Sequence, residues 1–182
     1  MWFQMVNMVL DVLAGLVAGT CLLRLLMQWQ RISFNQPLGR FVFAMTDWLI
    51  LPLRKVIPPV LSWDLSSLVG AWLVKLVQFI LLWLVAGAHG NWGLLPLVSL
   101  VGLAQLLASA LSALVLVLAI TSWVNPGTPM HVLAMRLCEP FLRPFQRVLP
   151  LMGGIDLSPM ALLLVLQLLG MLLSGLQMSL MR

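Results

Sequence analysis

The segment Leu51-Pro52-Leu53-Arg54-Lys55-Val56-Ile57-Pro58, followed by Asp64-Leu65-Ser66, recurs as Arg143-Pro144-Phe145-Gln146-Arg147-Val148-Leu149-Pro150, followed by Asp156-Leu157-Ser158. The matches fall at one offset of 92 positions, so that Pro52 corresponds to Pro144 and Asp64 to Asp156. A fixed offset indicates an internal repeat. Because each copy precedes a long apolar run, the repeated unit is predicted to be a membrane hairpin with a basic, proline-rich segment on one side. We expect two repeats, residues 1–90 and 91–182.

The composition places the chain in a lipid bilayer. Of its 182 residues, 62% are hydrophobic and only 8% are charged, and the mean hydropathy is +1.09. Soluble domains need a more polar surface than this. The net charge of +5 is dispersed between apolar runs, so we expect no nucleic-acid partner. Cys21 and Cys138 lie far apart, which argues against a disulfide framework or a CxxC metal site.

Four stretches are long and apolar enough to cross the bilayer: residues 5–27, 65–88, 94–120 and 157–180. A spanning helix needs about 20 apolar residues. No positive charge precedes the first stretch and no cleavage site stands out, so we interpret it as a span and not as a signal peptide. The predicted fold is an all-α membrane protein with four transmembrane helices.

Lysine and arginine residues predict the orientation. They gather in the loops 28–63 and 121–156 and are absent from the connection 89–93. Positive residues favour the cytoplasmic side, so both long loops should be cytoplasmic and both termini periplasmic. The two repeats would then share one orientation, as parallel repeats related by an axis along the membrane normal do.

Each long loop is predicted to hold an amphipathic helix that lies in the membrane interface. One candidate covers residues 37–51 and the other covers about 129–142. Both show apolar residues at helical spacing, but they are too short to span a bilayer. The prolines of each repeated segment are expected to end these helices and to fix the turn back into the membrane.

The repeated segment contains the residues with the most specific expectations. Asp64 and Asp156 directly precede a predicted span, where a carboxylate can cap free backbone amides and remain solvated. Two roles are open for four basic residues: contact with anionic lipid headgroups, or docking of a protein partner at the membrane. These residues are Arg54, Lys55, Arg143 and Arg147.

Asp11 and Lys75 are charged residues within predicted spans. At 1.5 Å per residue, their depths in the bilayer differ by only about 5 Å, so the two side chains could form a pair. A charge at mid-depth is costly and therefore a candidate for a functional role. The alternative is that the pair serves helix packing alone, as the small and polar residues on the other spans are expected to do.

Motifs for catalysis are missing from the sequence. It has no GxxxxGK phosphate loop, no HExxH zinc motif and no GxSxG nucleophile motif. In the predicted topology His89 and His131 fall on opposite sides of the membrane. We therefore expect a protein that is not an enzyme and that has no cofactor or metal site.

The repeated motifs resemble the signature of the YggT family of bacterial inner-membrane proteins, called YlmG in cyanobacteria and plastids. The resemblance rests on PLRKVIPP with DLSS, on RPFQRVLP with GGIDLSPM, on Asn35-Gln36-Pro37, and on Trp123-Val124-Asn125-Pro126. Gln146 departs from the family pattern, which usually has a basic residue there, and Trp63 replaces a small residue. The resemblance implies a multispanning inner-membrane protein without established catalysis. It also implies links to osmotic tolerance and, in photosynthetic relatives, to division, nucleoid or thylakoid organisation and cytochrome complex assembly.

Two functions remain open from the sequence. The first is a non-enzymatic adaptor or assembly factor whose basic segments hold anionic lipid or an unidentified membrane or cytoplasmic protein. The second is a small solute or ion pathway formed by a homo-oligomer, because four helices leave little room for a pore.

Overall fold

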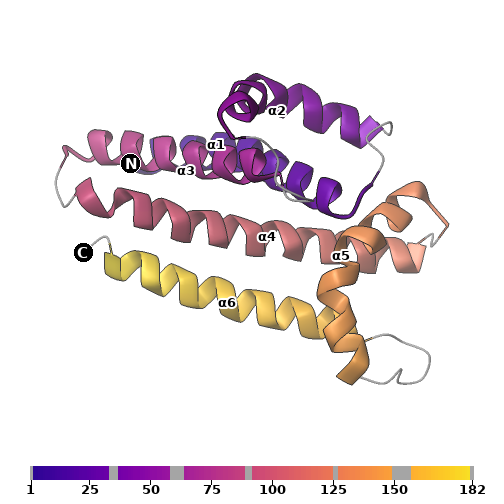
Figure 1. Ribbon diagram of the computed structural model, residues 1–182. Helices are drawn as coiled ribbons and strands as arrows, with labels where there is room; N and C mark the ends of the chain where they lie inside the picture. Colours follow the sequence, from indigo (N-terminus) through magenta and orange to yellow (C-terminus); the bar gives the residue numbers. More distant parts are fainter. Residues whose placement is uncertain are drawn as a thin grey trace. The chain divides into compact units, whose positions relative to one another are not determined.

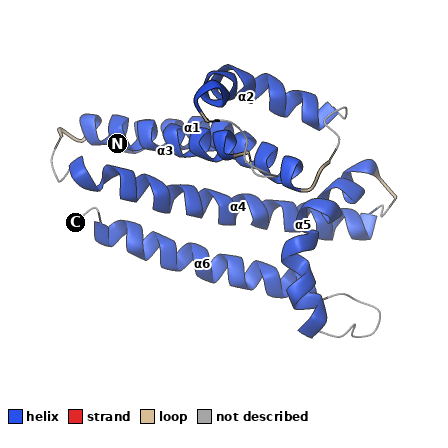
Figure 2. Ribbon diagram, viewed as in Figure 1, coloured by secondary structure: helices blue, strands red, loops and turns tan. Residues whose placement is uncertain are grey.

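The computed structural model describes residues 2–32, 37–57, 64–88, 92–124, 127–148 and 157–180, and all regular structure in these ranges is helical (Figure 2). The elements in chain order are α1 (Trp2–Trp29), α2 (Pro37–Val56), α3 (Leu65–Val85), the short 3₁₀ helix η1 (Trp92–Leu94), α4 (Leu95–Val124), α5 (Pro129–Val148) and α6 (Ser158–Leu180) (Figure 1).

Four of these helices are long and apolar enough to cross a membrane, and they confirm the four predicted spans. They are α1, α3, η1 with α4, and α6. A bilayer offers no water to backbone N–H and C=O groups, so an apolar segment satisfies them internally by forming a helix. The protein is therefore a multi-pass membrane protein.

The chain forms two compact units. The first comprises Met1–Leu106 with Gly175–Arg182, and the second comprises Leu107–Ser174, so that the boundary falls within α4. In the first unit α1 packs along α3, and α2 packs on both. The buried residues of α1 lie in its second half, from Ala18 to Met27, whereas the first half is largely exposed.

The second unit carries one buried stripe on each helix. In α5 the buried residues are Leu133, Ala134, Leu137, Cys138 and Leu142, a spacing that places them on one helical face. The start of α5 is joined to the end of α4 by a contact of 3.2 Å between His131 Nδ1 and the Thr121 hydroxyl. Burial raises the pKa of the Cys138 thiol to about 11, which makes it a packing residue and not a reactive thiolate.

Both predicted amphipathic helices are present. They are longer than predicted, because each helix continues through prolines that were expected to end it. Pro52 belongs to α2, and Pro140 and Pro144 belong to α5. The expectation that these residues break the helices is wrong. Pro52 and Pro144 are exposed, and each leaves the carbonyl four residues earlier without its helical N–H donor. The prolines bend α5 near its middle without ending it (Figure 1). Pro58, Pro59 and Pro150 lie outside the described residues.

Candidate functional site

The first unit holds a buried ion network where α1, α2 and the start of α3 meet. Asp64, which is fully buried, accepts a hydrogen bond of 2.6 Å from Arg54 Nη2 and another of 2.7 Å from the Ser67 hydroxyl, both through Oδ2. Arg54 Nη2 also donates to Gln28 Oε1 of α1 at 3.2 Å. One carboxylate oxygen thus joins the end of α2 to the beginning of α3.

Arg24 of α1 is the second centre of this network. Its Nη1 donates to Asp47 Oδ1 at 2.7 Å and to the Thr46 hydroxyl at 2.8 Å, and its Nε lies 3.9 Å from Asp64 Oδ2. The guanidinium stacks over the Phe43 ring at 4.4 Å from the centroid, and Arg24 is only 1% exposed. Two cations and two carboxylates therefore balance one another, and the two half-exposed members, Asp47 and Arg54, offset the cost of burying Arg24 and Asp64.

This network explains the Asp-Leu-Ser motif of the first repeat. While the Asp64 side chain holds Arg54, the Ser66 hydroxyl donates to the Ile57 carbonyl at 2.7 Å. The first bond joins the last turn of α2 to the residue directly before α3. The second joins the first turn of α3 to the residue directly after α2. In this unit the repeated segment therefore holds the end of α2 against the start of α3.

The structure corrects the predicted role of Asp64. The residue occupies the N-cap position of α3, but its side chain makes no capping hydrogen bond, and the side chain is buried and not solvated. Its backbone carbonyl does accept bonds from the amides of Ser67 and Leu68. The carboxylate pairs with arginine because two guanidinium groups are within reach. Asp156 lies outside the described residues.

Burial and the neighbouring cations act in opposite directions on the pKa of Asp64. Burial raises it, but the hydrogen bonds from Arg54 and Ser67 and the charges of Arg54 and Arg24 outweigh burial and hold the pKa below its usual value of 3.8. Asp64 is therefore ionised at neutral pH. It is an acceptor in this network and has no proton to give as a general acid.

The basic residues expected to bind a partner fall into two groups. Arg54 is paired within the chain, whereas Lys55 of α2 is exposed. In the second unit Arg147 is exposed, and Arg143 is 65% exposed and pairs with Glu139 one helical turn away, at 2.8 Å. Surface pairs of this kind contribute little stability and leave the arginine accessible to other anions.

The repeat offset explains why the two units differ. At 92 positions after Arg24 and Arg54 stand Leu116 and Gln146, so the second repeat lacks both cations that form the first network. In the second repeat, Glu139 stands at the position that corresponds to Asp47, and it forms an exposed ion pair with Arg143 on α5. Among the described residues of the second repeat, Glu139, Arg143 and Arg147 lie exposed on α5. The sequence alone does not indicate the first network, because an arginine at the end of a span is equally typical of contact with lipid headgroups.

The structure brings Asp11 and Lys75 together in the first unit. Lys75 Nζ lies 3.2 Å from Asp11 Oδ1 and donates to Gln78 Oε1 at 2.9 Å, while Gln78 Nε2 donates to Asp11 Oδ1 at 3.1 Å. Lys75 and Gln78 are buried, but the side chain of Asp11 is 68% exposed. The three polar groups satisfy one another within the spans.

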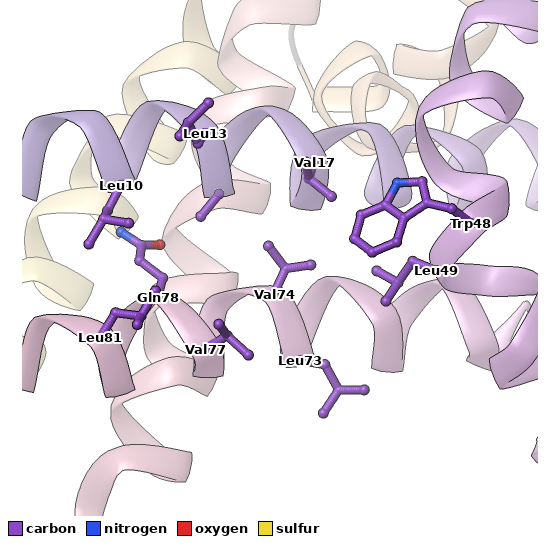
Figure 3. A pocket seen from close by; sticks show the side chains of 11 residues that line it. Leu10, Leu13, Val17, Trp48, Leu49, Leu73, Val74, Val77, Gln78 and Leu81 are labelled. Carbon is purple, nitrogen blue, oxygen red and sulfur yellow. The ribbon is translucent and has the colours of Figure 1, made fainter. Parts of the chain in front are cut away.

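An apolar groove runs between α1 and α3 beside this polar group. Its volume is about 360 Å³, and it extends from Leu10 and Leu81 to Trp48 and Leu49 of α2 (Figure 3). Gln78 is the only polar side chain apart from Trp48 among its lining residues. Within the described residues no cluster of three His, Cys, Asp or Glu side chains is placed to hold a metal ion.

Comparison with known proteins supplies the family. The family model described as CCB3/YggT matches residues 3–85 and 97–177, one segment in each predicted repeat. The chain is 39% identical over 154 residues to the uncharacterized protein YggT of Escherichia coli K12, covering 82% of this chain and 79% of the relative. It is 36% identical over 168 residues to an uncharacterized protein of Pseudomonas aeruginosa, covering 90% and 85%. No solved structure matches the chain. This multi-pass membrane protein therefore belongs to the CCB3/YggT family.

Proposed function

We propose that the protein is a non-enzymatic adaptor or assembly factor of the bacterial inner membrane, and that α5 is the surface on which it holds an acidic protein partner. The observation that carries this proposal is the exposed basic face of α5. Arg136, Arg143 and Arg147 are exposed and recur at i, i+7 and i+11, which places them along one side of the helix. Arginine is well suited to bind carboxylates because its planar group can donate two parallel hydrogen bonds.

The difference between the repeats supports this assignment. The first unit pairs Arg24 and Arg54 internally with Asp47 and Asp64, so both arginines are already engaged within the chain. In α5 Glu139 offers one carboxylate near three arginines, which leaves a net positive surface. A role in osmotic tolerance or envelope organisation would follow if the partner acts in those processes.

The proposal is tested by crosslinking in intact cells. A photoreactive residue at position 147 should trap a reproducible protein partner, and Arg136→Gln with Arg143→Gln should reduce the yield several-fold. Arg40→Gln is the matched control because Arg40 is an exposed arginine of the corresponding helix in the first unit. If the control lowers the yield equally, or if no protein is trapped, α5 is not the docking surface.

The second candidate is a small solute or ion pathway formed by an oligomer. It is favoured by one observation: Asp11 belongs to a polar cluster inside the spans, yet its side chain is 68% exposed. A charge facing hydrocarbon is costly, so a pathway or a second copy would have to solvate it. Uptake of K⁺ or glycerol by proteoliposomes, abolished by Lys75→Met, would favour this candidate. Absence of uptake together with a trapped partner would favour the adaptor.

A further inference from the structure

We propose that the groove between α1 and α3 binds one acyl chain of an anionic phospholipid, and that Lys55 of α2 binds its phosphate. The groove is lined mainly by leucine and valine side chains of both helices and is bordered by Trp48 and Leu49 of α2. This assignment extends the adaptor proposal to the first unit, but it does not depend on the partner that α5 binds.

The position of the groove decides the kind of occupant. Its walls are residues 10–17 of α1 and 73–81 of α3, which belong to two candidate spans, so it opens into hydrocarbon and not into water. Figure 3 shows leucine and valine side chains pointing into it from both helices. A hydrocarbon chain fits such a surface, whereas a polar ligand would lose its hydration without gaining partners.

One end of the groove indicates where a headgroup would lie. Trp48 closes the end that faces the inner half of α1 and α3, and its indole N–H is fixed by a 2.8 Å bond to the Met45 carbonyl. Lys55 follows Trp48 by seven residues, so it lies on the same face of α2, about 10 Å further along. Because Arg54 contacts Asp64, which directly precedes α3, this part of α2 lies beside the inner end of that span.

The charge of α2 selects an anionic lipid. Asp47 is the one acidic residue in α2, and Arg24 neutralises it, so the exposed face of the helix carries Arg40 and Lys55 without a compensating carboxylate. Arg54 is already neutralised by Asp64. Lys55 is therefore the cation available to a phosphate at the mouth of the groove, and a lysine near a charged headgroup favours binding about fivefold.

The experiment places the full-length protein in nanodiscs with phosphatidylglycerol or phosphatidylcholine carrying the same diazirine-labelled acyl chain. We expect labelling to concentrate in residues 10–17 and 73–81 and to favour phosphatidylglycerol about fivefold. Val77→Trp should remove this labelling by filling the groove. Val165→Trp, at a similarly exposed valine of α6, should not change it.

The variants separate the two parts of the site. Lys55→Gln should abolish the preference for phosphatidylglycerol while labelling of the groove persists, and Arg136→Gln in α5 should preserve that preference. Competition between the two lipids on the unaltered protein gives the same answer if Val77→Trp does not fold. Uniform labelling of all lipid-facing helices, equal labelling by the two lipids, or crosslinking of the groove to a second protein copy would overturn the proposal.

Discussion

Arg54 and Asp64 form an ion pair of 2.6 Å that joins the last turn of α2 to the first residue before α3. Both residues belong to the repeated segment. The repeat predicts that Asp64 caps α3, but it does not predict that Asp64 pairs with Arg54. The aspartate is completely buried and is shared with Arg24 of α1. Three helices of the first unit therefore depend on one carboxylate.

Removal of this carboxylate should destabilise the first unit strongly. Asp64→Asn removes the negative charge that pairs with Arg54 at 2.6 Å and lies 3.9 Å from Arg24, and breaking a buried pair in this way costs about 3–5 kcal/mol. Unfolding by sodium dodecyl sulfate in mixed micelles measures the change. Glu139→Gln is the control, because its exposed pair with Arg143 should contribute below about 0.5 kcal/mol. Equal losses in the two variants would contradict the proposed network.

The same pair should make stability depend on acid pH. Because the pKa of Asp64 is lower in the folded protein than its usual 3.8, its contribution is complete above that value and disappears as the pH falls through the folded pKa. Unfolding curves between pH 6 and pH 2 should show the unaltered protein losing stability below about pH 4. Asp64→Asn should lose less over that range. A parallel decline in both proteins would show that Asp64 is not the titrating group.

Gly102 should be intolerant of a side chain. A Cβ added there would lie 2.7 Å from the ring carbon Cε2 of Phe79, which is buried in α3. Gly102→Ala should therefore cost about 1–3 kcal/mol in the same unfolding assay. Gly19→Ala in α1 should be neutral or slightly stabilising, since its Cβ would have no neighbour within 4 Å. Combining Gly102→Ala with Phe79→Leu should restore part of the loss; no restoration would refute a steric cause.

Pro144 should maintain the bend of α5. Replacing it with alanine restores one backbone hydrogen bond and removes the clash with the preceding turn. Spin labels at positions 130 and 147 should then move apart toward about 25 Å, the length of 17 residues in a straight helix. Pro159→Ala in the first turn of α6 is the control, because proline disturbs little at that position. An unchanged distance in Pro144→Ala would assign the bend to another cause.

Hydropathy and the repeat were sufficient to predict the four spans and the two amphipathic helices, because both depend on local composition. The environment of individual charges was less predictable. Arg24 at the end of a span has the same sequence signature whether it faces lipid headgroups or, as here, binds Asp47 and stacks on Phe43. From its N-cap position alone, Asp64 is likewise expected to cap its helix. Only the structure shows that two guanidinium groups lie near its carboxylate. These contacts depend on how α2 packs on α1 and α3, which no local pattern specifies.

Thiol labelling in intact cells tests the orientation of the two repeats most directly. Single cysteines at positions 55, 147 and 92 would be introduced into a protein whose Cys21 and Cys138 are replaced by alanine. If both basic segments are cytoplasmic, positions 55 and 147 should resist a membrane-impermeant maleimide until the inner membrane is opened, and position 92 should react at once. Reaction of only one of positions 55 and 147 in intact cells would contradict the shared orientation of the repeats, and reaction of both would contradict their cytoplasmic placement.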